Sequence, residues 1–113
     1  KPSLVTADSK FKDVLDFVAA NFCNDISSSE LSRRFGYDEA YFCRRFKSVT
    51  GLTPMNYIQI LRLETAKEKI KSGNFKISEI SALCGFKDSS YFTRCFKKRY
   101  GMTPAEYTKV KNL

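Results

Sequence analysis

The sequence predicts an all-α fold of about seven helices, in which two similar units are joined by a long central helix. One observation behind this prediction is an internal repeat. A second is the placement of glycines and Thr-Pro pairs, which divides the chain into segments of helical length. No stretch alternates apolar and polar residues at a period of two, so no strand is predicted. At 113 residues, the chain suffices for one compact domain or two small subdomains.

The repeat is visible directly in the residues. Segment 41–57 recurs 50 positions later as 91–107, with Tyr-Phe at the start, Arg and Phe-Lys in the middle, and Gly, Thr-Pro and Tyr at the end. Upstream, segments 29–37 and 78–86 match at an offset of 49. The chain therefore contains two copies of one unit, and the second copy has one extra residue just after Gly85.

Turn and capping residues set the bounds of the predicted helices. The glycines lie where a helix should end or turn: Gly36, Gly51, Gly73, Gly85 and Gly101. Residues 27–30 (Ser-Ser-Ser-Glu) fit a capping box, and Thr53 and Thr103 each place a capping hydroxyl before a first-turn proline. The predicted helices span about 10–22, 28–35, 39–50, 54–71, 78–84 and 89–100, with a short last helix from residue 104.

These helices group into subdomains. We expect an N-terminal tail or linker at 1–9, a first subdomain at 10–53, a linking helix at 54–72 and a second subdomain at 73–113. Each subdomain has a short helix, a tight glycine turn and a second helix, which is helix-turn-helix spacing. We expect the linking helix to bury Tyr57, Ile58 and Leu61 against the first subdomain. Its second half is expected to bury Leu63, Ala66 and Ile70 against the second.

Helical periodicity divides the second helix of each unit into an inner and an outer face. The inner face is expected to carry Phe42, Phe46 and Val49 in the first unit, and Phe92 and Phe96 in the second. The outer face carries Ala40, Cys43, Arg44 and Lys47 in the first, and Ser90, Thr93, Arg94 and Lys97 in the second. Tyr41 and Tyr91 are assigned to the core with the phenylalanines, because their spacing fits a helical core better than base stacking.

The net charge of +8 is concentrated in these two helices. Window 41–50 carries +3 and window 91–100 carries +4, both without an acidic residue. A solvated helix face normally mixes signs, so two acid-free faces predict a polyanionic partner contacted at two places. An arginine flanked by small residues suits base contacts in a DNA groove, and the flanking lysines suit phosphates. The linking helix, about 27 Å long, can help to set two such helices about 34 Å apart, in successive major grooves.

Composition argues against other classes of function. The chain has no histidine, and its four cysteines (Cys23, Cys43, Cys84 and Cys95) lack C-x-x-C spacing, so we expect no metal, no cofactor and no enzyme activity. We expect four reduced, mostly buried thiols. No apolar run approaches the roughly 18 residues of a membrane span, and no signal-peptide pattern is present, so a cytoplasmic, nucleoid-associated protein is expected.

Three other functions are weaker fits to the sequence. A membrane-surface helix would need exposed bulky apolar residues, and an RNA-binding module would favour exposed aromatics. The main alternative is a helix-turn-helix protein-interaction adaptor without sequence-specific DNA binding. Such an adaptor would not need two acid-free cationic faces, and its binding would not weaken steeply with salt.

These motifs resemble the C-terminal DNA-binding domain of the AraC/XylS family of bacterial transcription regulators. The resemblance covers about 11–107 and is fullest in the second unit. It is carried there by Ile77-Ser78-Glu79-Ile80-Ser81, Gly85-Phe86, Ser90-Tyr91-Phe92, Arg94, Phe96-Lys97-Lys98, Gly101, Thr103-Pro104 and Tyr107. Ser32 and Ser81 replace the alanine that is usual in the family at the helix crossing, but both are small.

The resemblance implies a monomeric domain that regulates transcription by binding asymmetric sites in double-stranded DNA. By motif position, the base-contacting residues are Ala40, Cys43 and Arg44 in the first unit, and Ser89, Ser90, Thr93 and Arg94 in the second. The expected phosphate contacts are Lys47, Lys97 and Lys98. RNA polymerase and an N-terminal sensor or receiver domain are the other expected partners. Because the chain begins at Lys1 and has no room for such a domain, we expect a C-terminal fragment of a longer regulator.

Overall fold

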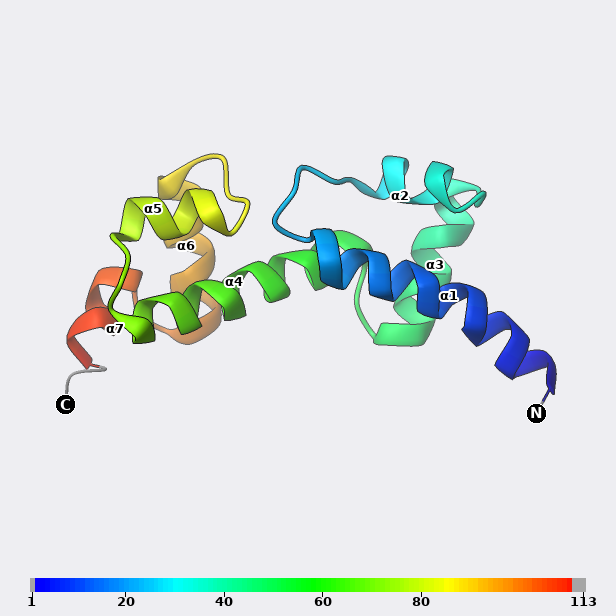
Figure 1. The fold of residues 1–113 in the computed structure, drawn as a ribbon, viewed down its shortest axis with the longest axis horizontal. Helices are drawn as coiled ribbons and strands as arrows, with labels where there is room; N and C mark the ends of the chain where they lie inside the picture. The colour runs from blue at the N-terminus through cyan, green and yellow to red at the C-terminus, as the bar shows by residue number, and fades with distance from the viewer. Residues whose placement is uncertain (1, 111–113) are drawn as a thin grey trace. The chain divides into compact units, whose positions relative to one another are not determined.

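The computed structural model describes the backbone of residues 2–110 and the side chains of residues 11–110. Over this range the chain forms helices and no strand, as the sequence predicts (Figure 1). The helices are α1 (Pro2–Asn21), α2 (Ser28–Arg34), α3 (Glu39–Thr50), α4 (Pro54–Ser72), α5 (Ile77–Leu83), α6 (Ser89–Tyr100) and α7 (Pro104–Val110). The predicted all-α class with seven helices is therefore confirmed for the described residues.

Helices α3 and α6 begin and end where the sequence predicts. Each begins after an aspartate: the carboxylate of Asp38 accepts from the Tyr41 N–H at 3.2 Å, and that of Asp88 accepts from the Ser90 N–H at 3.1 Å. Each ends at a glycine in the left-handed region, where a side chain would be strained. The same start and stop signals therefore bound both helices.

Helix α1 is longer than predicted. It begins at Pro2 rather than at Lys10, so residues 2–9, which we expected to be a tail or linker, have helical backbone. Pro2 occupies the first helical position, where proline lacks only an N–H that would have no partner in the helix. No glycine or further proline occurs between Pro2 and Gly36. The expectation failed because it took the helix start from the apolar stripe, which begins at Phe11.

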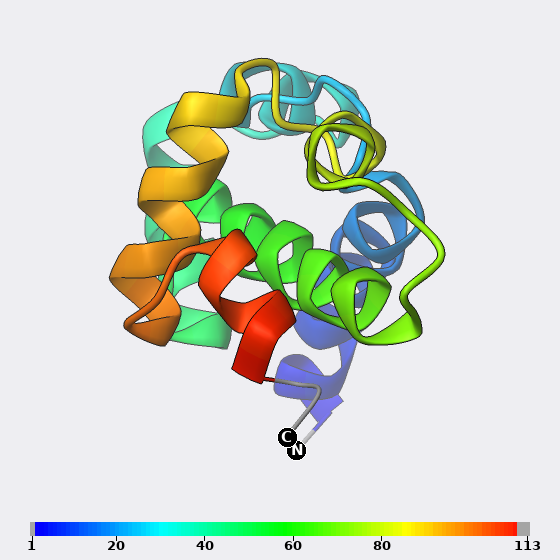
Figure 2. The ribbon, with the colours of Figure 1, turned by 90° about the vertical axis from the view of Figure 1, so that its left-hand side faces the viewer.

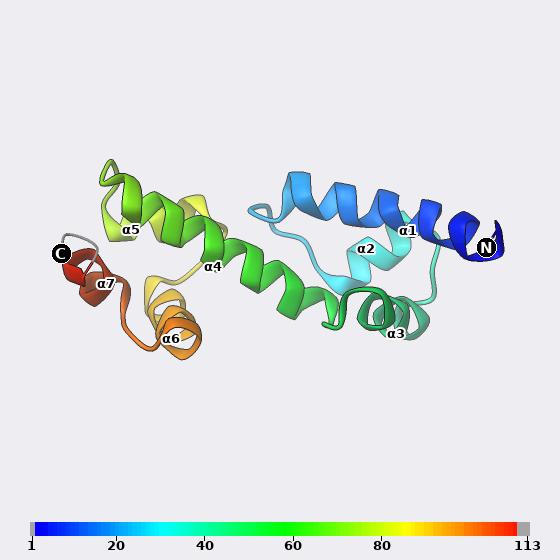
Figure 3. The ribbon, with the colours of Figure 1, turned by 90° about the horizontal axis from the view of Figure 1, so that it is seen from below.

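The chain divides into two compact units, residues 1–58 and 59–113, with the division inside α4. The first unit contains α1, α2, α3 and the start of α4, and α1 crosses α3 at a steep angle (Figures 1 and 3). The second unit contains the rest of α4 with α5, α6 and α7 around it (Figure 2). As expected, α4 supplies buried residues to both units, Ile58 to the first and Leu63, Ala66 and Ile70 to the second. Tyr57 and Leu61 are only half-buried.

Aromatic rings fill the core of the first unit. The ring centroid of Phe11 on α1 lies 5.9 Å from that of Phe42 and 5.5 Å from that of Phe46, both on α3. Phe46 also packs edge-on against Tyr57 of α4 at 5.2 Å. Aromatic pairs in such geometries add about 0.5–1.5 kcal/mol each beyond the burial of their surface. These contacts hold α3 with its two phenylalanines inward.

The second unit has an equivalent core. Its buried members are Leu63, Ala66, Ile70, Ile80, Cys84, Phe86, Phe92 and Phe96. The ring centroid of Phe96 lies 5.8 Å from that of Phe92, 4.7 Å from that of Tyr100 and 5.9 Å from that of Tyr107. Phe96 therefore joins α6 to α7, just as Phe46 joins α3 to α4.

Candidate nucleic-acid interface

The turn that precedes α3 is repeated before α6. Gly36 and Gly85 both have a positive φ, at 76° and 100°. After each glycine, the chain returns a backbone hydrogen bond to the preceding helix, from Tyr37 to the carbonyl of Ser32 at 2.8 Å and from Phe86 to that of Ser81 at 3.0 Å. Both serines are buried, so the small side chain at this crossing lets the two helices approach. Each pair, α2–α3 and α5–α6, is thus a helix-turn-helix with the same glycine and the same returning hydrogen bond, and the turn between α5 and α6 is one residue longer.

Helices α3 and α6 have the same order of buried, half-buried and exposed residues at every position. Only the two phenylalanines of each helix are buried, which leaves the opposite face open. The open face exposes the predicted residues Ala40, Arg44 and Lys47 in α3, and Ser89, Ser90, Arg94, Lys97 and Lys98 in α6, with Cys43 and Thr93 half-buried. The structure therefore brings the predicted residues of each unit to one exposed helix surface.

Three core assignments made from the sequence are wrong. Tyr41 and Tyr91 are 48% and 47% exposed, and Val49 is 39% exposed. The tyrosines precede the buried phenylalanines by one residue, so they lie about 100° around the helix from the core. Val49 lies in the last turn of α3, at the position that exposed Arg99 occupies in α6. An apolar residue at this position lies outside the packed face.

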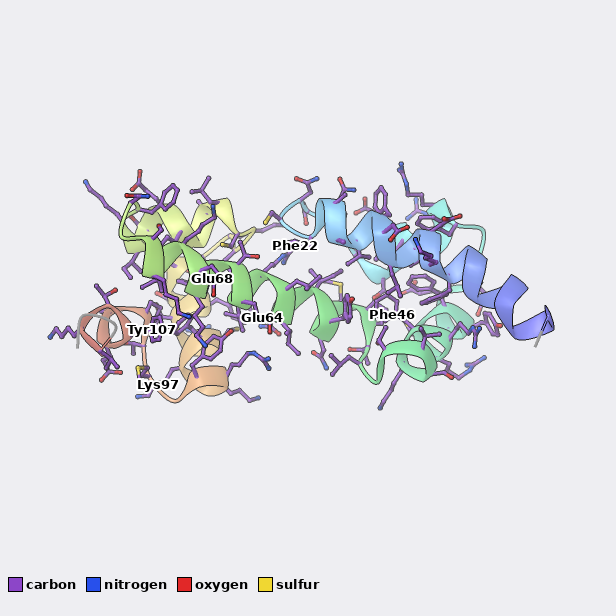
Figure 4. The ribbon with its side chains drawn as sticks, turned by 60° about the horizontal axis from the view of Figure 1, so that its bottom comes forward. Phe22, Phe46, Glu64, Glu68, Lys97 and Tyr107 are labelled. Carbon is purple, nitrogen blue, oxygen red and sulfur yellow. The ribbon has the colours of Figure 1, made fainter. Side chains whose placement is uncertain are left out.

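Arg45 and Arg99 contact residues on other helices of their own units. The guanidinium of Arg45 lies over the Phe11 ring, with Cζ 6.0 Å from the centroid. Arg99 of α6 pairs with Glu64 of α4 at an N–O distance of 3.7 Å (Glu64 is labelled in Figure 4). The exposed arginine–lysine pairs that remain, Arg44–Lys47 and Arg94–Lys97, occupy matching positions in the repeat.

Sequence reasoning missed Gln59, which lies at the start of the α4 segment in the second unit. Its Nε2 donates to the hydroxyl of Tyr91 at 3.2 Å and lies 2.7 Å from Sγ of Cys95. These partners are 32 and 36 positions away along the chain, so no local pattern indicates them. Cys95 and Arg99, for which the sequence suggested no role, both connect α6 to α4.

The described part of the chain was also expected to lack a metal site and a membrane span. Among those residues, no group of three or more histidine, cysteine, aspartate and glutamate side chains is placed to hold a metal ion. None of the helices described combines the length and apolar character that crossing a membrane requires. Of the cysteines, only Cys84 is buried. The expectation of mostly buried thiols is therefore wrong for Cys23, Cys43 and Cys95, which are half-buried.

A family model described as "Helix-turn-helix domain" matches residues 31–109, most of the chain, and the fold matches solved AraC-type regulators. The chain belongs to the AraC family. The resemblance found in the sequence is therefore confirmed, and so is the all-α fold with two helix-turn-helix units. As a member of this family, the chain carries a helix-turn-helix DNA-binding domain.

The AraC-family relatives include curated proteins and solved structures. The HTH-type transcriptional activator RhaS of Yersinia pestis (strain Pestoides F) is 30% identical over 82 residues, which cover 73% of this chain and 30% of RhaS. This chain thus spans about a third of the length of the curated relatives that it matches. The C-terminal domain of the two-component response regulator yesN from Fusobacterium nucleatum is 28% identical, with a TM-score of 0.82, over 86% of this chain and 95% of that domain.

A structure with the same fold was solved with DNA. The DNA-binding domain of AdpA, a global transcriptional factor, was crystallised in complex with a target DNA. It superposes on this AraC-family chain with a TM-score of 0.84 and 22% identity, over 88% of this chain and 89% of the AdpA domain. At this level of identity, the match establishes a shared fold.

Proposed function

We propose that this domain binds one asymmetric site in double-stranded DNA as a monomer, with α3 and α6 entering successive major grooves. The observation that carries the proposal is the matched pair of open helix faces, each with an exposed arginine and lysine at the same positions. A major groove admits an α-helix, and the second helix of a helix-turn-helix is the one that enters it. The crystallised complex of the AdpA domain with target DNA supports this use of the fold.

Base contacts are proposed for the residues on the open faces: Ala40, Cys43 and Arg44 on α3, and Ser89, Ser90, Thr93 and Arg94 on α6. Alanine and cysteine are poor hydrogen-bond donors, so Arg44 would supply most of the base discrimination of the first unit. The hydroxyl of Thr93 donates to the carbonyl of Ser89 at 2.9 Å. This bond engages the hydroxyl proton, so Thr93 would offer a base its methyl group and an oxygen lone pair.

Footprinting and analytical ultracentrifugation test the proposed stoichiometry. We expect one monomer to protect one asymmetric site of about 15–20 base pairs, because two non-identical units would contact two adjacent grooves. A requirement for a dimer on a palindromic site would contradict the proposal.

Phosphate contacts are proposed for Lys47, Lys97 and Lys98, and salt dependence tests the first two. Lys47→Ala and Lys97→Ala should each weaken binding to all sequences alike and lower the slope of log affinity against log salt by about one unit. Lys12→Ala is the control, because Lys12 lies on α1 and pairs with Asp16 at 2.9 Å. A changed base preference with an unchanged slope would show that the lysine contacts a base instead.

We also propose the partners of the full-length regulator. An N-terminal sensor or receiver domain is supported by the short coverage of RhaS and by the relative that is the C-terminal domain of a response regulator. RNA polymerase is the proposed protein partner at promoters, in a cytoplasmic, nucleoid-associated setting. Co-purification of RNA polymerase with the full-length protein on DNA that carries its site tests this proposal.

A further inference from the structure

Tyr91 lies in the first turn of α6 and is exposed, yet its side chain contacts three other residues. Its hydroxyl accepts from Nε2 of Gln59 at 3.2 Å, and its ring centroid lies 6.3 Å from that of Phe86. The Cζ of Arg94, one helical turn later, lies 5.7 Å from the same ring centroid. The aromatic ring therefore lies between an anchor on α4 and the arginine proposed to contact a base.

Gln59, the residue on α4 that anchors Tyr91, contacts two side chains of α6. The same Nε2 of Gln59 lies 2.7 Å from Sγ of Cys95, one turn further along α6 from Tyr91. A hydrogen bond with the Cys95 thiol also raises the pKa of the Tyr91 phenol above its ordinary value of 10.0. Like any tyrosine with a pKa at or above the ordinary value, Tyr91 is neutral near neutral pH, so its hydroxyl keeps its hydrogen bonds there.

The matching arginine of the first unit lacks this support. Tyr41, the counterpart of Tyr91, stacks on Tyr37 with ring centroids 5.9 Å apart and an angle of 25° between the planes. The counterpart of Cys95 is Arg45, whose guanidinium lies over Phe11. Within residues 11–110, Arg44 makes no ring contact of the kind that Arg94 makes. The two units therefore differ in how their base-contacting arginine is held.

We propose that Tyr91 is a positioning residue, anchored by Gln59, which holds the guanidinium of Arg94 ready for its base, so that the second unit discriminates bases more sharply than the first. The inference rests on the proposed base contact of Arg94. A free arginine side chain has many rotamers, and fixing it before binding removes part of the entropic cost of the contact. A cation–π contact at an exposed site corresponds to about a two- to five-fold effect on an equilibrium.

The test compares Tyr91→Leu with Tyr91→Phe and, as the matched control, Tyr41→Leu. Competition titrations measure the ratio of affinities for the selected site and for the same site with the Arg94 base pair changed. Tyr91→Leu should lower this ratio about two- to five-fold. Affinity for unrelated DNA and the salt slope should stay unchanged, because no charge is removed. Tyr91→Phe keeps the ring and loses only the bond from Gln59, so its loss should be smaller.

Tyr41→Leu should leave the corresponding ratio at the Arg44 base pair unchanged. A loss there as large as that of Tyr91→Leu would overturn the claimed difference between the units. An equal loss for Tyr91→Phe and Tyr91→Leu would overturn the role of the ring. Tyr91→Phe retains the aromatic packing and so remains informative if Tyr91→Leu does not fold.

Two further measurements separate this inference from the proposed function. If Arg94→Ala removes base preference and Tyr91→Leu does not change it, the positioning role fails and the base contact stands. If Arg94→Ala leaves base preference intact, the base contact itself fails. In the free domain, the NMR shift of the Arg94 side-chain Nε–H should move when the ring is removed in Tyr91→Leu and stay close to wild type in Tyr91→Phe. An unmoved resonance in Tyr91→Leu would overturn the contact with the ring.

Discussion

Replacing Arg94 by alanine is expected to remove the preference of the domain at one base pair, at a cost of about 1–3 kcal/mol of discrimination. Arg94 is exposed in the middle of α6, and its neighbours Ser90 and Thr93 are small enough to let a long side chain reach the base edges. A guanidinium donates two parallel hydrogen bonds to guanine, which a wrong base cannot accept. Binding-site selection on the variant measures the lost preference.

Arg44→Ala should have the same effect at a second base pair, about 10 base pairs from the first, because the two helices would enter successive grooves. Compared with Arg94→Ala, Arg94→Lys should bind DNA more tightly but recover only part of the base preference. Lysine keeps the positive charge but lacks the planar guanidinium that donates two parallel hydrogen bonds. Arg99→Ala is the control: Arg99 pairs with Glu64, and its loss should leave base preference intact. Uniformly weaker binding with unchanged preference in Arg44→Ala and Arg94→Ala would assign both arginines to phosphate.

Phe96→Ala is expected to destabilise the domain by about 3–5 kcal/mol, the usual cost of removing a buried phenylalanine ring. The ring is fully buried and contacts Phe92, Tyr100 and Tyr107, so its removal leaves a cavity between α6 and α7. The free energy of unfolding of a small domain is only about 5–15 kcal/mol, so this single change removes a large share of the stability. Urea denaturation followed by circular dichroism gives the change in the free energy of unfolding.

Phe46→Ala should cost a similar amount in the first unit, where Phe46 contacts Phe11, Phe42 and Tyr57. Val49→Ala is the control, because periodicity placed Val49 in the core and the structure exposes it. Its cost should stay within about 0.5 kcal/mol. A cost for Phe96→Ala as small as that for Val49→Ala would contradict the packing described for α6.

The helix bounds were predictable where the chain carries local stop signals. Gly51 and Gly101 end α3 and α6, and a helix cannot easily continue through a residue with positive φ. Asp38 and Asp88 cap the same two helices, although their caps were not recognised from the sequence. The start of α1 was missed because the apolar stripe begins only at Phe11, whereas Pro2 is compatible with the first position of a helix.

The open faces of α3 and α6 were predictable from the sequence, but the side-chain contacts between α4 and α6 were not. Periodicity gives the direction of a side chain around its own helix, so Arg44 and Arg94 were placed on the outer face. It says little about residues at the edge of the packed face, which is why Tyr41, Tyr91 and Val49 were misassigned. The partners of Gln59 and Glu64 depend on how distant helices pack, and no spacing in the sequence encodes that.

The identical burial of α3 and α6 makes each open face an exchangeable cassette for protein engineering. The two helices share their buried phenylalanines, caps and end glycines, while Ala40 and Cys43 stand where the second unit has Ser90 and Thr93. Transferring the second pair to α3 would change only exposed and half-buried positions, with the packed scaffold kept. Under the base contacts proposed above, this exchange is expected to change the DNA preference of the first unit and to leave that of the second unit unchanged.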